Sequence, residues 1–243
     1  MWPRPSEWHA SDNRATDGGV FLQTAVLTCG VGLGYGLRHA FESDHVAAVT
    51  NIVVDGKGSR SAALLGAFWG LGHGFAVVAA GCTLIALDVA VPRKLAFGLE
   101  LAVVLMLVGL GIRSLVRSRS SAVVGSAEHL HPHVLPHAHV SSGATRTPLA
   151  AAAIGLLHGA AGSSALVLMM LGLAPTRWHA LMFLGTFAVG ATVSMTGLSA
   201  LLAAPIGSAS DRWPSFVIRL RMGAGVFSLC AAAVLFVELL RHV

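Results

Sequence analysis

Charged residues are scarce in this chain of 243 residues, at 11% of the total, against about 25% in a typical soluble domain. Apolar residues make up 55%, and the mean hydropathy is +0.74. So little polar surface cannot cover a soluble globule of this length, which predicts a membrane protein. The formal net charge is +5, but the basic residues are scattered over loops and form no stripe with interleaved aromatic residues. Nucleic acid is therefore excluded as a partner.

Several chemical signatures are also missing. The three cysteines lie in apolar segments without CxxC spacing, so we expect small buried hydrophobes rather than a redox centre. No Walker-type glycine-rich loop is present, so the chain itself is not expected to hydrolyse ATP. The polar residues 1–19 lack the plain basic start and the cleavage site of a signal peptide, which predicts an uncleaved tail.

Long apolar runs, in contrast, are abundant. Six of them can cross about 30 Å of hydrocarbon, and they predict an all-α polytopic membrane protein in the lipid bilayer. They lie at about 20–37 (continuing toward 54), 62–87, 95–112, 149–173, 180–204 and 216–240. Basic residues are more numerous around loops one, three and five, which favours these loops in the cytoplasm and both termini outside.

The two halves of the chain resemble each other weakly. Gly36-Leu37-Arg38-His39 matches Gly155-Leu156-Leu157-His158, and Leu65-Gly66-Ala67-Phe68 matches Leu184-Gly185-Thr186-Phe187, both at an offset of 119 residues (158 − 39 and 184 − 65). Three helices in each half would invert the second half relative to the first, as in many secondary transporters. We therefore divide the chain into a tail (1–19), a first half (20–115), a cytoplasmic loop (116–147) and a second half (148–243).

Ionisable residues concentrate in one short apolar segment, Arg38-His39-Ala40-Phe41-Glu42-Ser43-Asp44-His45. Such groups are costly inside a membrane unless they pair, line a cavity or bind a ligand. At about 100° per residue, His39, Glu42 and His45 share an arc of roughly 120°, and Asp44 points elsewhere. Either the helix is kinked or unwound here, or Asp44 fixes a histidine tautomer from outside the ligand set. A plain ion-pair network around Arg38 is the alternative without a ligand.

Two lone histidines occur in other apolar runs. His73 lies in Gly70-Leu71-Gly72-His73-Gly74, and His158 is the repeat counterpart of His39. Each could be an ordinary core histidine, but beside the first motif we interpret both as metal ligands. Ser163 and Ser164 occupy the repeat positions of Asp44 and His45, so we expect them to line the same pathway.

The predicted loop holds five histidines within 129–139, and its prolines Pro132 and Pro136 exclude a helix there. A histidine-rich tract of this kind is typical of an accessory metal-binding segment, and a solvated linker is the alternative. Its histidines are His129, His131, His133, His137 and His139. Imidazole and carboxylate together suit borderline divalent metals such as nickel and cobalt.

These motifs resemble those of the nickel/cobalt transporter superfamily. His39-x4-Asp44-His45 resembles its H-x4-D-H signature, and Leu71-Gly72-His73-Gly74 resembles its second-helix motif. The chain has fewer predicted spans than the typical member and lacks the later L-G-F-D-T motif. It is more similar to the smaller six-helix nickel permeases that accompany urease or superoxide dismutase. The resemblance implies that His39, Asp44, His45 and His73 recognise and pass the metal.

The sequence thus predicts a permease, not an enzyme, that imports Ni²⁺ or Co²⁺ across the bacterial cytoplasmic membrane. The ion is expected as cargo, without a tightly bound cofactor, and a cytoplasmic nickel-enzyme maturation protein is a candidate partner. Efflux through the same site is the first alternative. A membrane metalloenzyme, a metal sensor, and a serine protease that uses Ser163 or Ser164 with His73 are the others.

Overall fold

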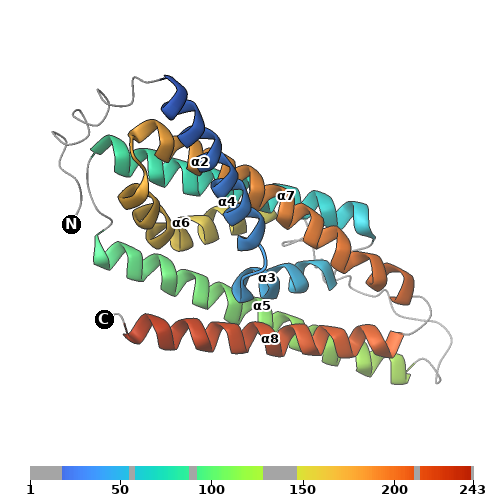
Figure 1. The fold of residues 1–243 in the computed structure, drawn as a ribbon. Coiled ribbons are helices and arrows are strands. Elements are labelled where there is room, and N and C mark those ends of the chain that lie inside the picture. The colour runs from blue at the N-terminus through green and yellow to red at the C-terminus, as the bar shows by residue number, and fades with distance from the viewer. Residues whose placement is uncertain (1–17, 55–57, 88–91, 128–146, 211–213, 242–243) are drawn as a thin grey trace.

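All regular structure in the described part of the chain is helical. The computed structural model describes residues 18–54, 58–87, 92–127, 147–210 and 214–241. The helices are α2 (Gly18–His39), α3 (Ser43–Val54), α4 (Ser59–Leu87), α5 (Arg93–Ala127), α6 (Pro148–Leu173), α7 (Arg177–Ser210) and α8 (Pro214–Arg241) (Figure 1). The histidine-rich tract 129–139 and most of the N-terminal tail lie outside the described residues.

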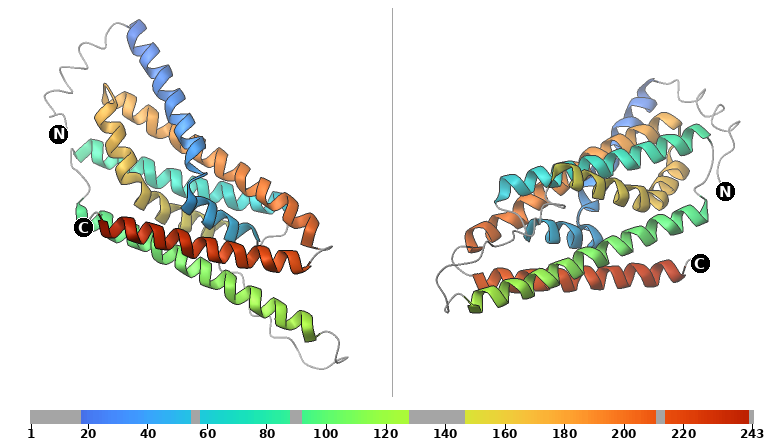
Figure 2. Two further views of the ribbon diagram at one scale, coloured as in Figure 1. Left: turned by 60° about the horizontal axis from the view of Figure 1, so that its bottom comes forward. Right: turned by 180° about the vertical axis from the view of Figure 1, so that it is seen from behind.

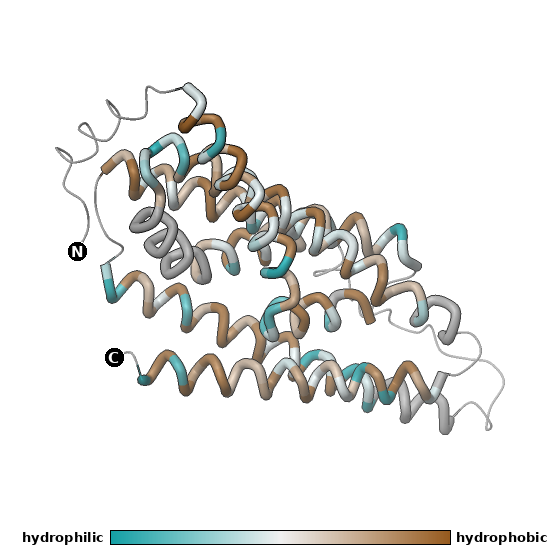
Figure 3. Tube along the Cα trace, in the orientation of Figure 1, coloured by the Kyte–Doolittle hydropathy of each residue, from teal (hydrophilic) through white to brown (hydrophobic). Residues whose placement is uncertain are grey.

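Five of these helices, α2, α4, α5, α7 and α8, are long and apolar enough to cross a membrane. Helix α6 is 26 residues long and begins with the apolar stretch Pro148–Ala161. Figure 3 shows apolar residues along the coloured parts of these helices. The predicted fold class, a polytopic helical membrane protein, is confirmed.

Local sequence explains where several helices begin. Pro148 and Pro214 are the first residues of α6 and α8, where proline lacks only an N–H that would be unpaired anyway. Thr147 caps α6, because its hydroxyl accepts the Ala150 N–H at 3.2 Å. Helix α5 continues to Ala127, so the first part of the segment 116–147 is helical rather than loop.

The helices pack in two groups (Figures 1 and 2). Helix α7 packs against α2 and α4, and α4 also packs against α6, while α5 and α8 form a separate antiparallel pair. The short α3 contacts α5, α7 and α8 and so connects the two groups. This pairing is symmetrical when the halves are exchanged: α4 pairs with α7, α5 with α8, and the α2–α7 contact corresponds to α6–α4. In Figure 1, α4 runs opposite to α7 and α5 opposite to α8, in agreement with the predicted 3+3 inverted repeat.

Glycines allow the closest helix contacts. A Cβ added at Gly36 of α2 would meet the backbone of Phe187 and Ala191 in α7, and one at Gly155 of α6 would meet the backbone of Trp69 in α4. These two glycines are repeat counterparts. Because lipid supplies no hydrophobic driving force between helices, such close backbone packing is a main source of their association.

Replacement of Gly36 by alanine is therefore expected to destabilise the protein by roughly 1–3 kcal/mol, because neighbouring backbone, not a flexible side chain, must move. The matched control is Gly34→Ala in the same helix, since a Cβ there meets no atom of the described residues within 4 Å. Thermal unfolding in detergent measures both. Equal midpoints for the two variants would contradict the proposed role of the Gly36 contact.

Candidate metal centre

The regular geometry of an α-helix is interrupted inside the histidine motif. Helix α2 ends at His39 and α3 begins at Ser43. Between them the Phe41 N–H donates to the Arg38 carbonyl at 2.9 Å and the Glu42 N–H to the His39 carbonyl at 3.1 Å, which forms a tight turn. Figure 3 shows polar residues at this junction in the middle of the apolar helices. A break in the helix was one of the two alternatives that the sequence left open, and it lets His39 and His45 approach each other.

Four histidines from four helices meet at this break. The centroid of the His45 ring (α3) lies 4.3 Å from that of His39 (α2), 5.2 Å from that of His73 (α4) and 4.2 Å from that of His158 (α6). The His39 and His73 centroids are 5.0 Å apart. All four side chains are buried. His45 is thus the centre of the cluster, with the repeat counterparts His39 and His158 on either side of it.

Asp44 joins two of these histidines. Its Oδ1 lies 3.0 Å from His45 Nδ1 and also accepts the His45 backbone N–H at 2.9 Å. Its Oδ2 lies 2.8 Å from His158 Nε2. The carboxylate therefore orients one imidazole from each half of the chain. A carboxylate that contacts a ligand histidine commonly fixes its tautomer and its ring orientation. Asp44 is placed to do this for His45 and His158, and it is also a candidate ligand itself.

The cluster contains two overlapping groups that could hold a metal ion. One consists of His39, His45 and His73 and the other of Asp44, His45 and His158, and the candidate ligand atoms of each group lie within 4.8 Å of one another. Several buried ring nitrogens have no hydrogen-bond partner among the described residues. They are His45 Nε2, both nitrogens of His73, and His158 Nδ1. Unpaired buried nitrogens are costly, and a divalent cation would satisfy them.

Glu42 lies at the edge of the cluster. Its Oε2 is 3.0 Å from His39 Nδ1, but 52% of its side chain is exposed. It belongs to neither group of candidate ligands. Arg38 is exposed as well, and the ion pairs within the described motif join histidines to carboxylates. Glu42 is thus placed to orient His39 rather than to complete either triad.

Two predicted groups cannot be placed. Ser163 and Ser164 lie on α6 beyond His158, but their side chains fall outside the described residues. The tract with His129, His131, His133, His137 and His139 falls outside them entirely. The roles suggested for these residues remain predictions.

The structure adds a residue that the sequence analysis did not identify. Trp69 of α4 is buried, and its ring centroid lies 5.6 Å from that of His45 and 6.1 Å from that of His158. Its ring forms an apolar wall of the cluster and limits the space around it. Trp69 precedes His73 by four residues, so both lie on one helical face. This spacing is the sequence signal that could have placed Trp69 beside the histidines.

The fold and the site together define a polytopic helical membrane protein with a buried histidine–carboxylate cluster between its two halves. The chain is 31% identical over 180 residues to the urease accessory protein UreH of Bacillus sp. (strain TB-90), a match that covers 70% of this chain and 73% of that protein. The chain belongs to the family of this urease accessory protein. No family model and no solved structure matches it.

Proposed function

We propose that this protein is a permease that moves Ni²⁺ inward across the bacterial cytoplasmic membrane and also accepts Co²⁺. The observation that carries the proposal is the buried cluster of four histidines around His45, drawn from α2, α3, α4 and α6. Imidazole suits nickel and cobalt better than it suits magnesium or calcium. A cluster of this kind at the interface of two inverted halves is also where secondary transporters bind their substrates.

The two overlapping groups suggest how the ion advances. In the first position His39, His45 and His73 hold it, and in the second Asp44, His45 and His158 hold it. His45 is common to both, so the ion can pass between them without losing all of its ligands at once. The second position includes the only carboxylate of the two groups, which lowers the cost of a bare dication in the membrane.

The membrane potential can drive this movement. Transfer of one charge is worth about 2.3 kcal/mol per 100 mV, and a dication gains about twice that on entry. Import therefore needs no ATP hydrolysis by the chain. The name of the Bacillus relative links its family to urease, so a cytoplasmic protein that matures a nickel enzyme is the partner we propose for the delivered ion.

The proposal predicts that cells expressing the chain accumulate more ⁶³Ni from nanomolar nickel than cells with an empty vector. The purified protein in detergent should bind Ni²⁺, measured by isothermal titration calorimetry, and excess Co²⁺ should compete. Accumulation below the vector control would indicate efflux through the same site. Absence of Ni²⁺ and Co²⁺ binding to folded protein would refute the proposal.

A further inference from the structure

Helices α2 and α7 meet along a seam that leads toward the histidine cluster. The α2 side of the seam consists of small residues at four-residue spacing: Thr24, Thr28, Gly32 and Gly36. A Cβ at Gly32 would meet Phe183 and Thr186, and one at Gly36 would meet Phe187 and Ala191. The α7 side has the same spacing: His179, Phe183 and Phe187. The two faces therefore run side by side for several turns.

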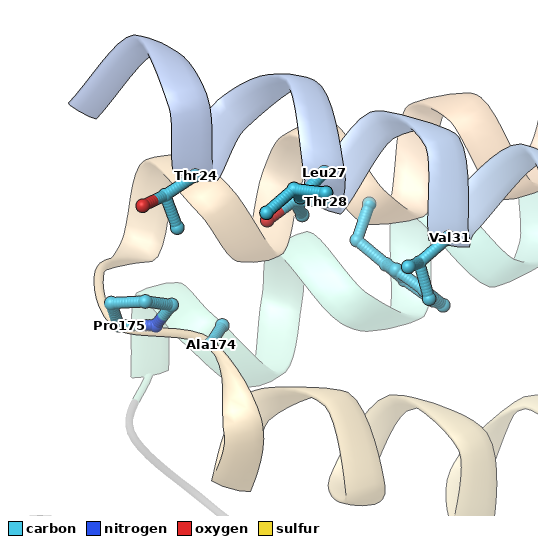
Figure 4. Close-up of a pocket in the computed structure, with 7 residues that line it drawn as sticks. Thr24, Leu27, Thr28, Val31, Ala174 and Pro175 are labelled. Carbon is cyan, nitrogen blue, oxygen red and sulfur yellow. The ribbon is translucent and has the colours of Figure 1, made fainter. Parts of the chain in front are cut away.

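A pocket of about 220 Å³ opens at the outer end of this seam (Figure 4). Thr24 and Thr28 of α2 line it on one side, and Ala174 and Pro175 of the α6–α7 connection line it on another. Phe183 of α7 also lines it. Nearby Trp178 is 62% exposed, as is common for tryptophan at the membrane–water interface. The pocket thus lies near the level at which α7 leaves the membrane.

Two aromatic rings separate this pocket from the cluster. Phe183 stacks on Phe187, with centroids 6.2 Å apart and planes at 18°. The Phe187 centroid lies 5.2 Å from that of His39. Both phenylalanines are buried. A continuous series of contacts therefore leads from the pocket to the outermost histidine of the cluster.

A fifth buried histidine lies in the same seam. His179 is 1% exposed, and its ring centroid is 4.8 Å from that of Phe21 in α2. Its Nδ1 lies 2.7 Å from Thr176 Oγ1, whereas its Nε2 has no hydrogen-bond partner among the described residues. His179 precedes Phe187 by eight residues, or about 12 Å along the helix axis. A nitrogen without a partner at this depth is available to a passing cation.

We propose that the α2–α7 seam is the access route of the divalent cation, with His179 as an outer ligand and Phe183–Phe187 as the barrier. This inference rests on the proposed transport function and names the path to its site. Apolar constrictions close a pore by excluding water. Gly32 and Gly36 put no α2 side chain between the backbones of α2 and α7. A small shift of α2 relative to α7 would therefore open the barrier.

Cysteine accessibility tests the pocket. In a background with Cys29, Cys82 and Cys230 replaced by serine, Thr28→Cys is expected to react with a membrane-impermeant cationic thiosulfonate. The matched control is Thr83→Cys, because Thr83 lies on the exposed surface of α4 and does not line the pocket. The adjacent Leu84 packs in one cluster with Ala180 and Phe183 of α7. The control should stay unlabelled. Resistance of Thr28→Cys to the reagent would mean that lipid fills the pocket, which overturns the route.

His179→Asn tests the outer ligand. We expect it to lower the initial rate of ⁶³Ni uptake by about tenfold, at the low end of the range for groups that support a metal site, and to leave equilibrium Ni²⁺ binding unchanged. The matched control is Thr196→Val, which removes a hydroxyl contact to the Thr192 carbonyl at 2.7 Å elsewhere in α7, so its uptake should stay near that of the wild type. Equal loss of uptake in both variants would make His179 a structural residue and overturn its role.

The outcomes separate this inference from the proposed function. If the wild-type protein binds no Ni²⁺, the permease proposal fails, whatever the labelling shows. If it binds and transports Ni²⁺ while Thr28→Cys stays unlabelled, or while bulky labelling of Thr28→Cys leaves uptake intact, the permease proposal stands and the route is wrong.

Discussion

Replacement of His45 by alanine is expected to abolish nickel accumulation and to weaken Ni²⁺ binding by more than the roughly 10–100-fold that loss of a supporting residue causes. The reason is its central position. His45 belongs to both groups of candidate ligands, and its ring lies 4.3 Å from that of His39 and 4.2 Å from that of His158. Without this ring neither three-ligand group is complete, and no shared ligand connects the two positions.

The measurement is calorimetric titration of the purified variant with Ni²⁺ beside ⁶³Ni uptake in cells. A control must show that loss of a buried polar group does not by itself abolish function. Ser228→Ala serves this purpose, because Ser228 is 0% exposed and donates to the Leu107 carbonyl at 2.9 Å in the separate α5–α8 pair. Comparable thermal unfolding of both variants would show that folding is retained. Uptake at the wild-type level by His45→Ala would rule out the site.

Much of the cluster could be predicted because its chemistry is local in sequence. Two imidazoles and two carboxylates within one apolar segment are too costly to be incidental. Helical geometry alone showed that a straight helix could not direct all of them to one point, and the structure breaks the helix between His39 and Ser43. The weak repeat also placed His158 in correspondence with His39, and both flank His45.

Contacts between distant segments could not be predicted from the sequence. Asp44 and His158 are 114 residues apart in the chain, and no local pattern indicates that a carboxylate of one half meets an imidazole of the other. Trp69 and His179 were missed for a similar reason: a tryptophan or histidine in an apolar run has many ordinary packing roles. Only the packing of Trp69 against His45 and His158, and of His179 against Phe21 of α2, distinguishes them.

The length of α5 was missed for a different physical reason. Hydropathy falls after Ile112, where Arg113, Arg117 and Arg119 follow, and the apolar run therefore ends there. Helix formation depends on backbone propensity as well, and arginine is a good helix former. Helix α5 accordingly continues to Ala127, beyond the apolar run that ends at Ile112.

Asp44→Asn is expected to cause the second largest effect, a loss of roughly 10–100-fold in Ni²⁺ affinity. The amide keeps the shape of the side chain but loses the negative charge, and one of its two ends becomes a donor. In the wild-type protein, Oδ1 of Asp44 contacts the His45 ring and Oδ2 contacts the His158 ring. An amide can preserve only one such arrangement, so at least one imidazole must change its tautomer or turn away.

The matched control is Glu42→Gln, the other carboxylate-to-amide change in the motif. Glu42 pairs with His39 alone and is half exposed, so water can replace much of its interaction, and we expect a clearly smaller loss of affinity. Both variants are titrated with Ni²⁺ under the same conditions. If the two losses are equal, the general negative charge of the motif matters, and the orientation of two histidines by Asp44 does not. If Asp44→Asn costs far more, the connection between His45 and His158 is what makes one site from the two halves.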